Sequence, residues 1–294
     1  MKGSRLHLDL FKVFRDLAET RSFSKTAMRN YLTQSAVSQQ VAFLERHYGE
    51  KLVERGRGRF SLTEHGEALL EGSRKILAAN QEVVDRIHHP GEISGTVSVQ
   101  TVHSIGLYDL ALFVKSFLRR YPRVNLRVEY HRSDMIYAHV SQGGCDLGIV
   151  AYPRPHPLIR IVPFKKEKLT LVCSSDDPLA ARKRVSLKVL NGKNFVAFSR
   201  NIPTGEVFDD ILRKAKVFVN VVHEFDNIET LKRSVEVGAG VSILPETTVA
   251  QEVKNKTLVC LQLSEGPFYR PTGIVLREGR TLPRAVKEFV RWLS

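Results

Sequence analysis

The feature that most restricts the fold of this chain is a long apolar repeat that stops at Pro90-Gly91. From Thr63 to Ile87 apolar residues recur at helical spacing without a break. Two series repeat every seven residues along it, Leu69, Ile76 and Val83, and Leu70, Leu77 and Val84. A single exposed helix could not leave so broad a seam in water, so the pattern predicts a partner helix from a second copy. Proline lacks an amide hydrogen, and the helix therefore ends there in a linker.

The residues before this helix predict three shorter helices. Apolar residues at helical spacing place the first over 8–19 and the second over 25–30, with Ser24 as its cap and Ala27 and Met28 facing inward. The third begins after Thr33, whose hydroxyl can satisfy an orphan amide, and ends at Gly49. Two short helices separated by a tight turn make a helix-turn-helix.

The third helix has the character of a recognition helix. At about 100° per residue, Val37, Val41 and Leu44 fall on one side and form a buried stripe. The other side and the amino end are short or amide-bearing, and glutamine and serine can hydrogen-bond base edges in the major groove. We therefore expect DNA contacts from Thr33, Gln34, Ser35, Ser38 and Gln39. An ordinary polar surface helix is the alternative interpretation of this stretch alone.

A basic hairpin follows the third helix. The segments 51–54 and 60–62 resemble strands, and between them lies Arg55-Gly56-Arg57-Gly58-Arg59. Glycine permits close approach to a phosphate backbone, and arginine supplies affinity that does not depend on base sequence. We interpret the hairpin as a wing whose Arg55, Arg57 and Arg59 hold phosphates. A solvated basic loop is the alternative.

Beyond residue 95 the pattern changes to alternating strands and helices. A strand at Val97 and Val99 is followed by a helix from Leu107 to Leu118. Further strands are expected at 125–130, 146–150, 168–174, 195–199, 217–224, 257–263 and 272–276. Further helices are expected at 135–142, 206–214, 227–237 and 283–293. This alternation predicts an α/β architecture, whose ligands bind beyond the carboxyl ends of the strands.

Composition narrows the class of protein. The net charge of +14 fits a polyanionic or anionic partner, but residues 1–90 hold only 15 Lys+Arg against 11 Asp+Glu, so an anionic ligand of the larger part is also open. No apolar run approaches the roughly 18 residues of a membrane span, and we expect a cytoplasmic protein. Three separated cysteines, Cys145, Cys173 and Cys260, fit buried thiols better than a disulfide framework or a metal site.

At this point the chain resembles the LysR-type transcriptional regulators over essentially its whole length. The amino-terminal signature lies at Phe11-Lys12-Val13-Phe14, Ser22-Phe23-Ser24, Gln34-Ser35-Ala36-Val37-Ser38 and Leu62-Thr63-Glu64-His65-Gly66. The larger part resembles the family at Tyr121-Pro122, at Gly144-Cys145-Asp146-Leu147-Gly148-Ile149 and from Val237 to Pro245.

The resemblance implies a winged helix-turn-helix domain (1–63), a linker and dimerisation helix (64–90) and an effector-binding domain like a periplasmic binding protein (91–294). It divides the last into subdomain I (91–163 and 268–294) and subdomain II (164–267). The partners implied are double-stranded DNA with an inverted-repeat operator, a second copy in a homodimer, a dimer-of-dimers tetramer and RNA polymerase. A small effector is implied, with no cofactor, no metal and no membrane.

The resemblance also places the effector between the subdomains. The residues implied are Thr101, His103, Ser104, Ser133, Ser199, Arg200, Phe225 and Asn227. Ser104 begins a predicted helix, where free amides and the helix dipole favour an anion. For each residue taken alone, a helix cap or a turn is the competing role.

Other classes of function find less support in the sequence. No Walker loop, GxSxG elbow or HExxH pair occurs, and the glycines of Gly238-Ala239-Gly240 follow a helix instead of a strand, so we expect no enzyme. A regulator without a ligand would not need about 200 residues of α/β domain. A thiol-based redox sensor lacks the cysteine pair at the place where such relatives carry it. We therefore predict a regulator whose promoter binding responds to a small anionic metabolite.

Overall fold

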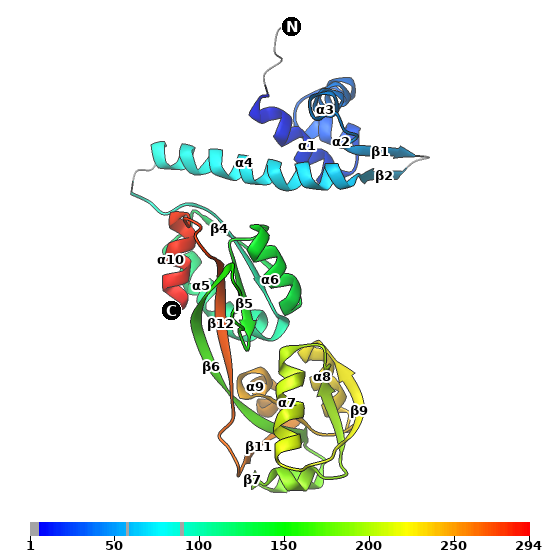
Figure 1. Cartoon of the computed structure of the whole chain (residues 1–294), viewed down its shortest axis with the longest axis vertical. Coiled ribbons are helices and arrows are strands. Elements are labelled where there is room, and N and C mark those ends of the chain that lie inside the picture. Colours follow the sequence, from blue (N-terminus) through cyan, green and yellow to red (C-terminus); the bar gives the residue numbers. More distant parts are fainter. Residues whose placement is uncertain (1–5, 57–58, 89–90) are drawn as a thin grey trace. The chain divides into compact units, whose positions relative to one another are not determined.

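The computed structural model describes residues 6–56, 59–88 and 91–294, and the chain forms two compact units, Met1–Gly95 and Thr96–Ser294. Each unit has its own hydrophobic core. The elements of the first unit, labelled in Figure 1, are α1 (Leu8–Thr20), α2 (Phe23–Arg29), α3 (Gln34–Tyr48), β1 (Val53–Gly56), β2 (Arg59–Leu62) and α4 (Glu64–His88).

The third helix has the buried stripe that its sequence predicts. Val37, Val41 and Leu44 are all 0% exposed. Val37 packs with Val13 and Ala27, whereas Val41 and Leu44 join the core that α1 and α4 share. The hydroxyl of Thr33 accepts a hydrogen bond from the amide of Ala36 at 3.2 Å, which confirms the predicted cap.

Two details of α2 differ from our expectation. The helix begins at Phe23, and its cap is Ser22, whose hydroxyl accepts a hydrogen bond from the amide of Lys25 at 3.3 Å. Ser24 therefore lies inside the first turn and donates to Oε1 of Gln34 instead. Met28 is 78% exposed, so the prediction that it faces inward is wrong. The helix has only two turns, and it is Ala27 that packs against α1 and α3.

The long helix α4 is fixed at its amino end. The hydroxyl of Thr63 accepts a hydrogen bond from the amide of Gly66 at 3.0 Å and donates to the carbonyl of Lys51 at 2.5 Å. Gly66 is required here because a Cβ at this position would lie 2.1 Å from the carbonyl oxygen of Leu52. These contacts hold the amino end of α4 against the residues that precede β1.

The second unit consists of two lobes that share the long strands β6 and β12 (Figure 1). The first lobe contains β3 (Gly95–Thr101), η1 (Ile105–Leu110), α5 (Ala111–Arg120), β4 (Val124–Tyr130), α6 (Ser133–Gln142), β5 (Leu147–Ala151) and α10 (Arg284–Leu293). The shared strands are β6 (Ile159–Ser174) and β12 (Tyr269–Arg277). The second lobe contains η2 (Pro178–Ala181), β7 (Arg184–Val185), η3 (Leu187–Leu190), β8 (Asn194–Phe198), α7 (Pro203–Lys214), β9 (Asn220–Phe225), α8 (Ile228–Glu236), β10 (Ser242–Pro245), η4 (Glu246–Val249), α9 (Ala250–Lys254) and β11 (Leu258–Leu263).

The main sheet of this unit has the order β4-β3-β5-β12-β6-β11-β7, with β10 also pairing to β6. Strands β3 and β5 are parallel, whereas β12 is antiparallel to both β5 and β6. Because β6 pairs with β12 in one half and with β10 and β11 in the other, it is much longer than the strand predicted at 168–174. The strand β10 was not predicted, since its four residues are all buried and show no alternation.

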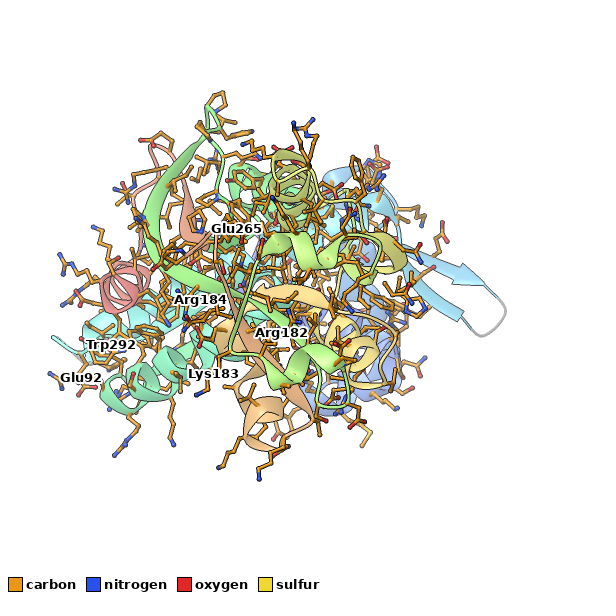
Figure 2. The ribbon with its side chains drawn as sticks, turned by 90° about the horizontal axis from the view of Figure 1, so that it is seen from below. Glu92, Arg182, Lys183, Arg184, Glu265 and Trp292 are labelled. Atoms are coloured by element: carbon orange, nitrogen blue, oxygen red, sulfur yellow. The ribbon has the colours of Figure 1, made fainter. Side chains whose placement is uncertain are left out.

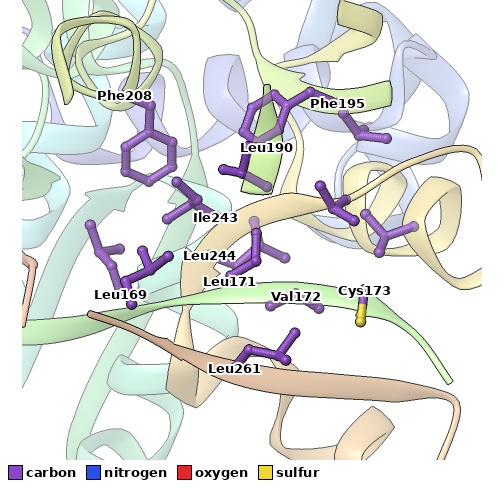
Figure 3. Close-up of a cluster of buried hydrophobic side chains, with 14 of the residues drawn as sticks. Leu169, Leu171, Val172, Cys173, Leu190, Phe195, Phe208, Ile243, Leu244 and Leu261 are labelled. Atoms are coloured by element: carbon purple, nitrogen blue, oxygen red, sulfur yellow. The ribbon is translucent and has the colours of Figure 1, made fainter. Parts of the chain in front are cut away.

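Each lobe is closed by its own apolar packing. In the second lobe Leu171, Leu190, Phe195 and Ile243 meet above the sheet (Figure 3). In the first lobe the rings of Phe117 and Phe289 lie 4.8 Å apart, and Trp292 (Figure 2) donates to the hydroxyl of Ser116 at 3.1 Å. In the part of the chain that the structure describes, no helix combines the length and apolar character needed to cross a bilayer.

Candidate functional site

A cavity of about 340 Å³ lies in the second unit, bordered by both of its lobes. Residues from the ends of β3, β4, β5, β8 and β9 and from β12 form its walls, which is where ligands of α/β domains bind. The lining residues are Val102, His103, Ser104, Tyr130, His131, Arg132, Ser133, Met135, Ala151, Phe198, Ile202, Pro203, Thr204, Asp226, Asn227, Ile228 and Arg270.

Four helices begin at this cavity. The continuous helix that contains η1 and α5 starts at His103 and has Ser104 in its first turn, whereas α6 starts after Arg132, α7 after Ile202 and α8 after Asn227. All five of these residues line the cavity. The first turn of a helix has amide hydrogens without intrahelical partners and carries a partial positive charge. The cavity is therefore electrostatically suited to an anion.

The floor of the cavity contains a buried arginine. Arg270 of β12 is 2% exposed, and its Nη1 donates to the hydroxyl of Ser104 at 3.1 Å. Its Nε and Nη2 donate to the two carboxylate oxygens of Glu167 at 2.7 and 2.9 Å. Since Arg270 and Glu167 are direct cross-strand partners, the sheet register holds the guanidinium in one orientation.

One side of the cavity presents stacked rings. The imidazole of His103 stacks on Tyr130 with centroids 4.9 Å apart and planes at 19°. Tyr130 also packs against the first turn of η1, where a Cβ on Gly106 would lie 2.5 Å from the ring. The glycine thus allows the helix to approach the ring, and together they supply a flat apolar surface beside the anion-favouring helix ends.

The cavity gathers half of the effector-site residues that we predicted. His103, Ser104, Ser133 and Asn227 line it. Asn227 also caps α8, since its Oδ1 accepts a hydrogen bond from the amide of Glu229 at 2.8 Å.

The structure does not place Thr101, Ser199, Arg200 and Phe225 among the lining residues. Thr101 is 0% exposed, and its hydroxyl donates to the carbonyl of Ile149 at 3.2 Å. The guanidinium of Arg200 pairs with the carboxylate of Asp209 at 3.2 Å. The ring of Phe225 packs against the core of the second lobe.

Polar contacts join the two lobes near the cavity. Nη2 of Arg132 donates to the carbonyl of Asn201 at 3.4 Å, and Arg154 forms an ion pair with Glu206 of α7. On another side the hydroxyl of Tyr108, in η1, hydrogen-bonds both Glu229 and Lys232 of α8. A change in the distance between η1 and α8 would therefore break a hydrogen bond to a lysine that is only 2% exposed.

In the first unit, the predicted recognition surface is accessible. Thr33, Gln34, Ser35 and Gln39 are exposed, and Ser38 is half-buried. Of the wing residues, Arg57 lies outside the described residues, and for Arg55 and Arg59 the structure describes the backbone strand but not the side chain. The wing contacts that we predict for these arginines stay predictions.

The apolar seam of α4 divides into two parts. Leu70 is 7% exposed within the core of the first unit, and Leu69 packs against the same core. In contrast, Ile76, Val83 and Val84 are 40%, 54% and 37% exposed, and Leu77 is half-buried. Of the predicted dimerisation residues, only the carboxyl-terminal ones are thus left open to a partner.

Each of the two units matches a known protein family. Residues 8–67 match the model of the bacterial regulatory helix-turn-helix protein of the lysR family, and residues 90–294 match that of the LysR substrate binding domain. The chain belongs to the LysR family. It is a LysR-type DNA-binding transcriptional regulator with an effector-binding domain.

Two of the proteins that resemble it match nearly its whole length, and a third matches its effector-binding part. It is 27% identical over 296 residues to the transcriptional activator CmpR of Synechocystis sp. (strain ATCC 27184 / PCC 6803 / Kazusa), which covers 100% of this chain and 96% of CmpR. The crystal structure of full-length CbnR with its target DNA has a TM-score of 0.76 at 22% identity, covering 98% and 99% of the two chains. The regulatory domain of CcmR from Synechocystis PCC6803, in complex with 2-PG, has a TM-score of 0.62 at 21% identity, covering 67% of this chain and 95% of CcmR's.

Two functional candidates of this LysR-type regulator, Arg270 and Tyr31, give no local signal in the sequence. Arg270 precedes the apolar residues of its strand, which begin at Ile274. Its contact with Ser104 depends on a sheet register that local periodicity does not encode. Tyr31, between α2 and α3, is 97% exposed with φ of 54°, a conformation that a non-glycine residue rarely adopts. An isolated Tyr after a short helix gives no periodic signal.

The cysteines of the regulator are poorly suited to redox chemistry. Burial raises the pKa of Cys145 to about 12 and those of Cys173 and Cys260 to about 11. The thiolate is the reactive form, so a raised pKa lowers the reactivity of these thiols at neutral pH. Within residues 6–56, 59–88 and 91–294, no group of three or more His, Cys, Asp or Glu side chains could hold a metal ion.

Proposed function

We propose that this regulator binds an inverted-repeat operator and that a small anionic metabolite in the cavity of its second unit changes that binding. The observation that carries the proposal is the meeting of four helix amino ends at one cavity, with Ser104 and Arg270 at its floor. Carboxylate, phosphate and sulfate groups all suit such a site.

Named relatives support both halves of this proposal. CbnR has been solved with its target DNA, and the CcmR regulatory domain has been solved with 2-PG. The target DNA is bound by CbnR and 2-PG by CcmR. For this chain they support a DNA partner for the first unit and a small effector for the second.

On DNA, α3 would occupy the major groove. Gln34, Ser35, Ser38 and Gln39 would read base edges, while Thr33, Arg55, Arg57 and Arg59 would hold phosphates. We add Tyr31 as a phosphate contact, because its exposed hydroxyl lies in the turn just before α3. In a dimer the two α3 helices would enter successive major grooves about 34 Å apart.

Assembly would use the open part of the α4 seam. Ile76, Leu77, Val83 and Val84 would pack against the same residues of a second copy, and two such dimers would form the tetramer. We expect contact with RNA polymerase at the promoter, action in the cytoplasm beside the operator, and no catalytic step or cofactor. In this proposal residues 1–63 bind DNA, residues 64–90 form the dimer and residues 91–294 bind the effector.

The effector then acts by linkage. A ligand shifts an assembly only by its different affinities for the alternative states. Because the cavity is bordered by both lobes, ligand contacts with η1, α6, α7 and α8 would favour one lobe spacing over another. The ligand would in this way bias the spacing of the DNA-binding heads in the tetramer.

A thermal-shift screen of small anionic metabolites on the full chain tests the proposal. A true effector at 100 times its Kd should stabilise the protein by about 2.7 kcal/mol. The hit should also alter the operator footprint, and its neutral amide or alcohol analogue should do neither. If only neutral compounds stabilise the protein, or if no anion does, the anionic effector is wrong.

A further inference from the structure

A second hollow in the first lobe lies apart from the cavity that the two lobes border. Its volume is about 450 Å³, and it is lined by Arg160 at the start of β6, by the loop between β12 and α10, and by Lys287 of α10. Figure 1 shows this end of β12 on the side of the first lobe that faces away from the second lobe. Arg277, which lines the hollow, follows Arg270 by seven positions (277 − 270) on β12, so at roughly 3.3 Å per residue about 20 Å separate them. The hollow is therefore a separate site.

Positive side chains dominate this hollow. Four of its lining residues are cationic, namely Arg160, Arg277, Arg280 and Lys287. One lining residue, Glu278, is acidic. Arg280 is already balanced, because its Nη2 donates to Oδ1 of Asp146 at 2.9 Å and its Nη1 donates to the carbonyl of Cys145 at 3.2 Å. This pairing holds the loop after β12 against the residues that precede β5, and it leaves three cations of the hollow to be neutralised.

These three cations have no anionic partner of their own. In the described part of the chain, Arg160, Arg277 and Lys287 form no ion pair and no side-chain hydrogen bond. Arg160 pairs across the sheet with Leu276, the neighbour of Arg277, so the strand register holds two like charges close together. With Glu278 counted, three positive charges face one negative charge, which is a net charge of +2 (3 − 1). Like charges held together repel, so this arrangement gains stability when an anion enters the hollow.

The hollow offers little surface to the organic part of a ligand. Among its lining residues Leu282 is the one large apolar side chain, and none is aromatic. The cavity between the lobes differs in this respect, because the rings of His103 and Tyr130 stack there. The hollow can therefore select a ligand by its charge, but not by a ring or a hydrocarbon chain.

The unpaired cations reach the hollow from three elements. Arg160 comes from β6, Arg277 from β12 and Lys287 from α10, whose first turn contains no acidic residue to offset them. A carboxylate has two oxygens in one plane, whereas a phosphate group has oxygens in several directions and suits cations that converge. The phosphates of DNA form a line, with one charge per roughly 3.4 Å of each strand, and proteins bind them with a basic stripe or face. Convergence on one hollow favours a compact phosphate ligand over a DNA backbone.

We propose that this hollow is a second ligand site, in which Arg160, Arg277 and Lys287 bind a compact free anion of the diphosphate type. A single phosphate ester carries a charge of about −1.5 to −2 at pH 7, and a diphosphate group presents at least that charge on more oxygens. Residues 1–90 hold +4 (15 − 11) of the net charge of +14, so +10 lies in the larger part of the chain, and the hollow gives part of that surplus a ligand. Binding exchanges counterions for the ligand and changes no covalent bond. The site does not depend on the effector that we propose for the cavity between the lobes.

Inorganic pyrophosphate is the probe, and the full chain without DNA is the sample. Calorimetric titration at about 0.15 M salt suppresses binding by net charge alone, because exposed charges more than roughly 8 Å apart are then largely screened. Arg277→Gln/Lys287→Gln removes two of the three unpaired cations and should weaken binding about tenfold, since charge-assisted hydrogen bonds are lost. Both side chains are exposed, so this variant should keep the fold. Lys214→Gln/Lys254→Gln is the matched control, because it removes the same charge from exposed positions elsewhere in the second unit and should bind pyrophosphate as the wild type does.

Hydrogen exchange locates the bound anion. Pyrophosphate should slow the exchange of amides in residues 278–286, which form the loop after β12 and the first turn of α10. Ser104→Ala/Ser133→Ala removes two hydroxyl groups from the cavity between the lobes, and the protection of residues 278–286 should persist in this variant. The two sites can thus be told apart in the same protein.

Each outcome decides for or against the second site. Binding that Arg277→Gln/Lys287→Gln weakens and the control does not, with protection of residues 278–286, supports it. Equal affinity in the two double variants, or protection only at the amino ends of η1, α6, α7 and α8, overturns it and leaves the anionic effector intact. Absence of pyrophosphate binding at about 0.15 M salt also overturns it. If Arg277→Gln/Lys287→Gln instead lowers operator affinity and its salt dependence while pyrophosphate protects nothing in residues 278–286, the cations contact DNA and the free-anion site is wrong.

Discussion

Ser104 and Arg270 lie 166 residues apart in sequence, yet Nη1 of Arg270 donates to the hydroxyl of Ser104 at 3.1 Å. The serine lies in the first turn of the first helix of the second unit, and the arginine lies on one of the strands shared by its two lobes. The contact joins a helix amino end to a strand that reaches both lobes. A ligand that touches Ser104 is thus one hydrogen bond from the part of the fold that sets the lobe geometry.

The cap of α3 should matter for the recognition helix. Thr33→Ala removes the acceptor for the amide of Ala36 and should destabilise the first turn of the helix by about 1 kcal/mol. Hydrogen exchange of the α3 amides measures this directly. Thr33→Ser keeps the hydroxyl and should restore protection; equal exchange in Thr33→Ala and the wild type would show that the cap is unimportant.

Much of the first unit could be predicted because its information is local. The positions of Val37, Val41 and Leu44 follow from helical periodicity, and Thr33 and Gly49 are residue types that begin and end helices. The error at Ser24 has the same origin. Two serines two residues apart are both competent caps, and only the packing of Ala27 against α1 and α3 decides between them.

The second unit shows where such reasoning stops. Its alternation of strands and helices was predictable, but the pairing of Glu167 with Arg270 depends on the register of strands that meet from distant parts of the chain. Likewise, the family resemblance implied an effector contact for Thr101, whereas in the structure its hydroxyl donates to the backbone of β5. Strand ends can be predicted from sequence, but side-chain direction at those ends requires the register.

The exposed part of α4 should hold the dimer. Ile76→Asp places a charge in the apolar seam and should abolish dimers in analytical ultracentrifugation, because a buried unpaired carboxylate is costly. Ala78→Asp is the matched control, since residue 78 is exposed and lies about 200° around the helix. A dimeric Ile76→Asp protein would rule out the seam as the interface.

The wing should contribute affinity that does not depend on base sequence. Arg55→Ala should lower operator and non-operator binding alike and reduce the slope of log affinity against log salt by about 0.9. Fluorescence anisotropy across a salt series measures both quantities. Arg213→Ala, in α7 of the second unit, removes the same charge elsewhere and should change neither. An unchanged slope for Arg55→Ala would show that this arginine holds no phosphate.

The three cysteine thiols, two of them buried and Cys260 partly buried, should make the protein sensitive to alkali. The pKa values of Cys145, Cys173 and Cys260 rise from 9.0 to about 12, 11 and 11 on folding, so their contribution to stability is fully present below pH 9. It is lost as pH rises from 9 through these higher values, because the unfolded thiols ionise first. The unfolding temperature should therefore fall above pH 9, and less so in Cys173→Ala/Cys260→Ala. At pH 7 iodoacetamide should leave Cys145 and Cys173 of the folded protein unmodified; rapid alkylation of either would contradict their assignment as buried and inert.

The proposed effector site requires that an anion binds where the helix amino ends meet. Crystals of the full chain grown with selenate, an anomalous scatterer of sulfate shape, test it most directly. We expect an anomalous peak in the cavity within hydrogen-bonding distance of Oγ of Ser104, and its loss in Ser104→Ala/Ser133→Ala. Selenate found only on the outer surface of the protein, with the cavity free of anomalous density, would contradict it.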